Sequence, residues 1–137
     1  MNKFWSGGFL YNPRNEAVLL HKRDSNTKFN PNTWAFFGGL SENSESPVDT
    51  FLREMSEEIG IKFDEKEVIT LCNYFNEEFQ THRYVFYMAS TRPISDFSLT
   101  EGYGLAWLNL NRLGEYRLSS KTSIDLKFFI KNKTNLQ

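Results

Sequence analysis

The chain is poor in cysteine and has no long apolar run, and each shortage excludes a class of protein. Cys72 is the single cysteine among 137 residues, so the chain has no internal disulfide and no cysteine framework for zinc. The N-terminal residues lack the apolar run of a secretory signal, and no segment is apolar enough to span a bilayer. We therefore expect a cytoplasmic protein without a membrane partner.

A surplus of either charge is also lacking. Sixteen Lys and Arg residues stand against seventeen Asp and Glu residues, and the net charge is −1. A nucleic-acid polymer is therefore not expected as a partner, because such proteins usually carry a basic surface. Small anionic nucleotides would depend on a metal and a few local cations, for which the candidates are His21, Lys22, Arg23 and Lys28.

What the chain does have is aromatic residues and a length that suits one domain. Aromatic residues make up 16% of the sequence, and thirteen of them are Phe, which favours a well-filled core over disorder. A chain of 137 residues supports a single sizeable core. We predict one domain over residues 1–137.

The clearest local signal is a helix between Ser46 and Gly60. Ser46 suits the N-cap, Pro47 the first helical position, and Asp49 completes the start signature. Gly60 stands where a left-handed residue usually ends a helix. Apolar residues recur between them at helical spacing and predict one buried stripe, formed by Val48, Phe51, Leu52, Met55 and Ile59.

Three glutamates project away from that stripe. Glu54 faces Glu57 and Glu58 at helical spacing, where like charges repel each other. The cluster also lies in the C-terminal half of the helix, where the backbone dipole disfavours anions. An all-carboxylate cluster of this kind points to a hard divalent cation, Mg²⁺ or Mn²⁺. The alternative is a solvated helix face, although Arg53 is the only basic residue on this helix.

The segment as a whole resembles the Nudix box, G-x5-E-x7-R-E-U-x-E-E-x-G-U, in which U is a bulky aliphatic residue. All nine defined positions are filled without a gap, by Gly39, Glu45, Arg53, Glu54, Met55, Glu57, Glu58, Gly60 and Ile61. The resemblance extends more weakly over most of the chain. It looks like a single-domain Nudix hydrolase of the MutT type.

The resemblance implies roles for the box residues. Glu57 and Glu58 would coordinate the metal, and Glu54 would be a ligand or the general base. The backbone carbonyl of Gly38 would join the metal ligands. Arg53 would orient the carboxylates through charge-assisted hydrogen bonds, a task that suits a planar guanidinium. Glu45 would be structural and would tie the preceding loop to the helix.

Two further residues resemble MutT-type positions outside the box. Glu101 precedes Gly102 and stands six residues before Trp107, which fits a metal ligand or general base; its alternative is an ordinary turn glutamate. Arg23 ends an apolar run where related enzymes place a phosphate-binding arginine; its alternative is a solvated cation. Immediately before the box, Phe37 stands in place of the common proline.

The expected elements agree with the fold that the resemblance implies. We predict strands over 4–11, 17–21, 34–37, 68–75, 82–89 and 104–108, and a closing helix over 123–131. Residues 68–75 and 82–89 would pair as a hairpin. The implied fold class is α/β, a Nudix-type α/β/α sandwich with a mixed β-sheet between helices.

The implied activity is metal-dependent attack of water on a diphosphate linkage in a nucleoside diphosphate derivative. Nucleoside triphosphates are favoured as substrates because the chain is short, while nucleotide sugars, ADP-ribose and dinucleoside polyphosphates stay open.

Other readings are a non-catalytic nucleotide-binding regulator, an RNA-end hydrolase, and an isomerase that uses Cys72. Dimers are common in the family but have no signature here. Residues that would stack on a base or belong to the core are Trp5, Phe75, Phe79 and Tyr103.

Overall fold

A computed structural model describes residues 2–26, 28, 31–99 and 104–136. Within that part of the chain, seven strands form one mixed sheet with the order β3-β2-β1-β6-β5, while β4 pairs with β1 and β7 pairs with β2. The strands are β1 (Trp5–Asn12), β2 (Ala17–Lys22), β3 (Trp34–Ala35), β4 (Phe37–Leu40), β5 (Ile69–Asn76), β6 (Thr81–Ala89) and β7 (Gly104–Asn109). Strand β1 runs parallel to β6 and antiparallel to β2 and β4.

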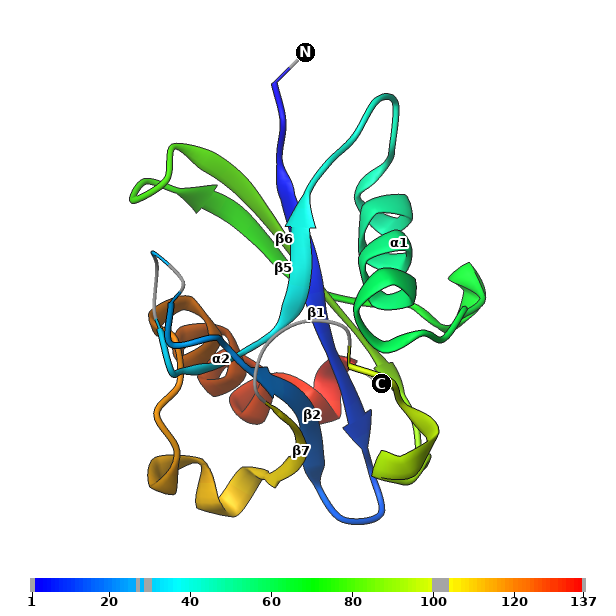
Figure 1. Ribbon diagram of the computed structural model, residues 1–137, viewed down its shortest axis with the longest axis vertical. Helices are drawn as coiled ribbons and strands as arrows, with labels where there is room; N and C mark the ends of the chain where they lie inside the picture. The colour runs from blue at the N-terminus through cyan, green and yellow to red at the C-terminus, as the bar shows by residue number, and fades with distance from the viewer. Residues whose placement is uncertain (1, 27, 29–30, 100–103, 137) are drawn as a thin grey trace.

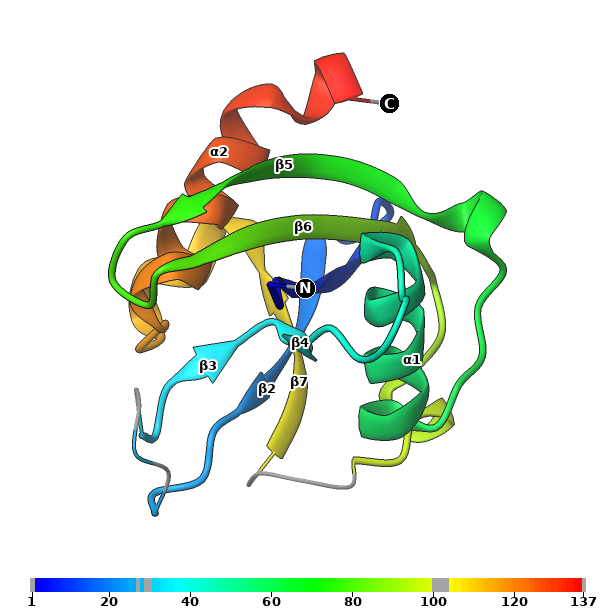
Figure 2. The same cartoon turned by 90° about the horizontal axis from the view of Figure 1, so that it is seen from above.

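Two helices, α1 (Pro47–Ile59) and α2 (Ser120–Leu136), cover opposite faces of this sheet (Figures 1 and 2). Phe51 and Met55 of α1 pack into one core cluster, and Phe129 of α2 packs into another. Neighbouring residues of β1 point to different clusters, Phe9 to the α2 side and Leu10 to the α1 side, because side chains alternate along a strand. The predicted α/β/α arrangement is confirmed.

Local signals hold α1 at both ends. The Ser46 hydroxyl accepts a hydrogen bond from the Asp49 N–H, and the Asp49 carboxylate accepts one from the Ser46 N–H. At the other end Gly60 is left-handed, with φ of 74°. Phe51, Met55 and Ile59 are fully buried. The predicted start and end of this helix are confirmed, and its predicted apolar stripe packs into the core with Val48 and Leu52 only partly buried. Its acidic face is free to point elsewhere.

Most other predicted elements are present with shifted ends, but the strand predicted over 34–37 is two strands, β3 and β4, and the closing helix continues past residue 131 to Leu136. The β5–β6 hairpin forms and pairs antiparallel. Helix α2 begins three residues earlier than residue 123, because its first turn is polar and carries no apolar periodicity. Three short 3₁₀ segments were not predicted: η1 (Glu65–Glu67), η2 (Ile94–Asp96) and η3 (Leu110–Glu115). In the described part of the chain, no helix is long and apolar enough to cross a membrane.

Candidate active site

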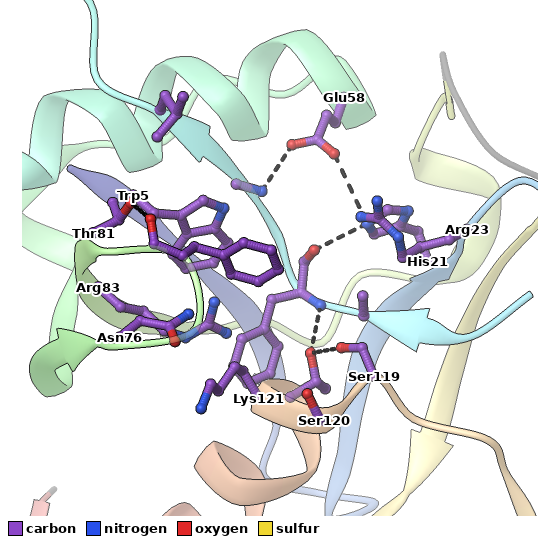
Figure 3. Close-up of a pocket in the computed structure, with 16 residues that line it drawn as sticks. Trp5, His21, Arg23, Glu58, Asn76, Thr81, Arg83, Ser119, Ser120 and Lys121 are labelled. Atoms are coloured by element: carbon purple, nitrogen blue, oxygen red, sulfur yellow. Dashed lines mark hydrogen bonds and ion pairs between the residues drawn. The ribbon is translucent and has the colours of Figure 1, made fainter. Parts of the chain in front are cut away.

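A cavity of about 530 Å³ opens between the C-terminal half of α1 and the first turn of α2 (Figure 3). This volume suits a small-molecule ligand. The described residues that line it include three permanent cations, Arg23, Arg83 and Lys121, and one carboxylate, Glu58. A surplus of positive charge in a concave site favours an anionic ligand.

Next to the cavity, Arg53 binds the acids of the Nudix box. Its Nε donates to Glu45 at 2.6 Å, and its Nη1 donates to Glu54 at 3.0 Å and to Glu57 at 3.1 Å. Its Nη2 donates to the Leu40 carbonyl at 3.1 Å, so the guanidinium also fixes the loop before α1. These are the contacts expected of an arginine that orients carboxylates, although its role in catalysis stays a prediction.

Glu45 has the structural position predicted for it. Its carboxylate accepts hydrogen bonds from the Glu42 N–H and the Thr50 hydroxyl as well as from Arg53. The hydrogen bond from Arg53 is the main cause that lowers the pKa of Glu45 to about 2. Glu45 therefore stays ionised and joins the loop to the helix.

Glu58 reaches the cavity and fixes its rim. Its Oε2 accepts a hydrogen bond from the Gly38 N–H at 2.9 Å, and its Oε1 lies 3.9 Å from His21 Nε2. The structure thus brings Glu58 and Gly38 together through the Gly38 N–H; coordination by the Gly38 carbonyl stays a prediction. His21 Nε2 also lies 2.9 Å from the Phe36 carbonyl and donates to it (Figure 3).

Glu54 lies between this rim and Arg53. Its carboxyl group contacts that of Glu58, and burial raises its pKa against the opposing effects of Glu58 and Arg53. A Cβ at Gly39 would collide with the Glu54 carboxylate, so the bare glycine backbone is what lets this side chain lie there.

The donor chemistry fits a hard cation. Glu54 and Glu58 offer oxygen ligands, with Glu57 one turn away on the same helix, and Mg²⁺ and Mn²⁺ prefer such ligands. Among the described residues no group of three His, Cys, Asp or Glu side chains is already gathered as a metal site. The predicted ligand Glu101 lies outside the described residues. The metal site therefore stays a prediction.

The predicted nucleotide-binding cations separate into two groups. Arg23 lines the cavity, as a phosphate-binding residue should, whereas Lys22 and Lys28 are not among its described lining residues. The expectation that His21 acts as a cation is wrong: burial lowers its pKa to about 4, so the ring is neutral at pH 7.

The aromatic residues considered for base stacking differ in whether they line the cavity. Trp5 and Phe79 line the cavity, whereas Phe75 points to solvent with 51% of its surface exposed. Tyr103 lies outside the described residues. Cys72 lies in β5, as predicted, and burial raises its pKa to about 12. The thiol is therefore protonated at pH 7 and is not among the described residues of the cavity, which counts against a cysteine-based isomerase.

Sequence reasoning missed several lining residues, among them Asn76, Arg83 and Lys121. These three come from β5, β6 and the first turn of α2, and only the packing of α2 beside the β5–β6 hairpin brings them together. No spacing motif connects such distant positions. The polar residues that begin α2 were the one available hint, since they interrupt the apolar pattern.

Comparison with solved structures places this fold among Nudix proteins. A MutT/nudix family protein from Enterococcus faecalis superposes with a TM-score of 0.74 at 19% identity, over 98% of this chain and 63% of that chain. This chain thus spans less than two thirds of that one. A MutT structure, from work on Aliivibrio salmonicida and Vibrio cholerae, gives a TM-score of 0.73 at 22% identity, over 95% of this chain and 98% of that one.

A third structure shows the same fold within a larger protein. The bifunctional NMN adenylyltransferase/ADP ribose pyrophosphatase of Francisella tularensis has a TM-score of 0.72 at 16% identity, over 96% of this chain and 42% of that one. Comparison with curated proteins gave no match. The family model described as NUDIX domain matches residues 6–128. The chain therefore belongs to the NUDIX domain family.

Proposed function

We propose that this single domain hydrolyses a diphosphate linkage in nucleoside diphosphate derivatives, with Mg²⁺ or Mn²⁺ as cofactor and nucleoside triphosphates as the favoured substrates. The observation that carries the proposal is the gathering of the box acids beside a cavity with a positive lining: Arg53 holds Glu54 and Glu57, and Glu58 lines the cavity. A cation beside these acids would offset their negative charge, and a polyphosphate would match the lining.

Each residue near the rim has a definite task in this proposal. Glu57 and Glu58 would hold the cation, while Arg53 keeps Glu54 and Glu57 in place through its Nη1. A bound divalent cation would neutralise phosphate charge and lower the pKa of the attacking water. Glu54 or Glu101 accepts the proton of that water; burial raises the pKa of Glu54, which brings it closer to the range of a general base.

Other residues that line the cavity support binding of the substrate. Arg23, on the Glu58 side, supplies positive charge for the phosphates, and Trp5 and Phe79 supply aromatic surface for a base. The Francisella tularensis neighbour was solved complexed with AMP and a manganese ion, so that bifunctional protein binds a nucleotide and a divalent metal. That protein is also an ADP ribose pyrophosphatase, so ADP-ribose and nucleotide sugars stand as the second substrate class.

The test is a substrate panel with one substitution. Nucleoside triphosphates, nucleotide sugars, ADP-ribose and dinucleoside polyphosphates are incubated with and without Mg²⁺, and release of phosphate, pyrophosphate and nucleoside monophosphate is measured. Glu57→Gln should reduce kcat by about a hundredfold or more, because it removes a charged ligand that positions the reacting groups. Its stability should match the wild type, since the Glu57 side chain is 56% exposed and its pair with Arg53 contributes little.

The matched control is Glu65→Gln, an exposed acid in η1. It removes the same charge and should leave turnover unchanged. Near-normal turnover in folded Glu57→Gln protein contradicts the assignment of Glu57. Absence of turnover across the panel, together with tight nucleotide binding in calorimetry, would favour the non-catalytic regulator.

A further inference from the structure

Arg83 is a buried charge whose hydrogen bonds are incomplete. The residue is 8% exposed, and its Nε donates to Asp125 Oδ2 at 2.9 Å. The other Asp125 oxygen accepts from the Tyr74 hydroxyl at 2.8 Å, so this carboxylate has a partner on each oxygen. Among the described residues, no protein acceptor binds the Nη groups of Arg83. The buried polar atoms that lack a partner in the described part of the chain are His21 Nδ1 and the Tyr87 hydroxyl, so the Arg83 Nη groups reach solvent and are available to a ligand.

Those donors belong to the wall of the cavity. Arg83 lines it, and the guanidinium lies 4.0 Å from the ring centroid of Trp5, which limits the directions in which the planar group can turn. Asp125 is 1% exposed and holds the Nε side. The guanidinium is therefore a rigid fork whose Nη–H donors face the ligand space.

Asn76 adds a donor on the same face of the hairpin. In the β5–β6 register Tyr74 pairs with Arg83 and Asn76 with Thr81, so all four side chains lie on one face. The Asn76 Oδ1 accepts from the Glu78 N–H at 3.2 Å, which leaves its NH₂ as the group that it can offer. Figure 3 shows Asn76 beside Arg83, on the opposite side of the cavity from Glu58. This wall offers hydrogen-bond donors and requires acceptors.

We propose that Arg83, supported by Asn76, is a specificity-determining residue that binds the paired acceptors O6 and N7 of a guanine-type base. This rests on the proposed function, which puts the diphosphate at the Glu58 side and so leaves the base for the opposite wall. A guanidinium fork matches O6 and N7 of guanine with two hydrogen bonds, whereas adenine presents an NH₂ donor beside N7. Adenine would therefore set a donor against a donor.

The test compares bases that differ in these acceptors. For wild-type protein, kcat/KM for GTP should exceed that for ATP by about fivefold to about 150-fold, which corresponds to one bidentate pair. ITP keeps O6 and N7 and should be used like GTP, whereas 7-deaza-GTP lacks N7 and should lose at least about fivefold. Arg83→Gln should reduce the preference for GTP over ATP to less than about threefold. The loss should appear mainly in KM.

The matched control is Arg112→Gln, an exposed arginine of η3 that pairs with Glu115. It should keep the wild-type preference. If Arg83→Gln does not fold, the wild-type comparison of GTP with 7-deaza-GTP still decides, because it needs no substitution. Equal use of GTP, ATP and 7-deaza-GTP by the wild type overturns the proposal, and so does an unchanged preference in folded Arg83→Gln protein.

A binding experiment separates this inference from the proposed activity. Calorimetry with GMP and AMP reports base preference whether or not the chain hydrolyses anything. Tighter binding of GMP that is lost in Arg83→Gln, in a protein without hydrolase activity, would support base recognition and contradict the proposed reaction. Hydrolysis of triphosphates with no preference among bases would contradict the inference alone.

Discussion

Two arginines near the cavity differ in the number of carboxylates around them. Arg53 lies within 4 Å of four carboxylates, those of Glu42, Glu45, Glu54 and Glu57. Among the residues that the structure describes, Arg83 has one carboxylate partner, Asp125, and that acid is already shared with Tyr74. The α1 network therefore has acceptors in excess and suits a cation, whereas the β6 network has donors in excess and suits an acceptor. One ligand with a polyphosphate at one end and an acceptor-rich base at the other would complement both.

The two networks also differ in their contact with water. Asp125 is almost fully buried, whereas the Arg53 side chain is 20% exposed and that of Glu57 is 56% exposed. Breaking a buried ion pair leaves an uncompensated charge in a poorly solvated place, and breaking an exposed one leaves a charge that water can hydrate. We therefore expect the β6 network to control stability and the α1 network to control activity.

The largest effect should come from removing Asp125. Asp125→Ala leaves Arg83 buried without its counter-charge and should lower the free energy of unfolding by about 3 kcal/mol. Asp96→Ala is the matched control, because Asp96 lies 3.7 Å from Arg92 in an exposed pair and its loss should cost less than about 0.5 kcal/mol. Urea titration at pH 7 measures both. Equal losses in the two variants would show that burial does not distinguish the pairs.

A smaller effect is expected from titrating Glu45, the structural acid of the α1 network. Its pKa is lowered from 4.5 to about 2 by the hydrogen bond from Arg53, so the folded state favours the ionised form. The linked stability is present above pH 4.5 and is lost as the pH falls towards 2. Because water reaches this pair, we expect it to contribute about 1–2 kcal/mol.

The measurement compares wild type with Glu45→Gln at pH 6 and at progressively lower pH. The wild type should be the more stable protein at pH 6, and the gap should narrow as the pH drops below 4.5. A constant gap down to pH 3.5 would mean that ionisation of Glu45 does not stabilise the fold.

The α1 network could be predicted from the sequence, whereas the β6 network could not. Arg53, Glu54 and Glu57 lie within two turns of one helix, so helical geometry alone brings them together. Arg83 and Asp125 are forty-two positions apart and meet only because α2 packs against β5 in the folded sheet. The prediction that His21 is a cation failed for a related reason. Its sequence neighbours Lys22 and Arg23 are cations, but its own ring is buried. Burial is a property of the tertiary structure, and local sequence predicts it poorly.

The smallest change in stability, with a large change in activity, is expected at Gly39. A Cβ there would meet the far end of the flexible Glu54 side chain and not backbone, so Gly39→Ala should change the free energy of unfolding by less than about 1 kcal/mol. The displaced carboxylate would no longer hold its place between Arg53 and Glu58, and a misplacement of about 1 Å can lower kcat about a hundredfold. Gly114→Ala is the matched control, because a Cβ at Gly114 meets no described atom within 4 Å and should leave both quantities unchanged. Thermal melting and kcat measured on the same preparations decide the question. Normal turnover in Gly39→Ala would show that the α1 acids tolerate displacement. The α1 and β6 networks would then differ only in how deeply they are buried.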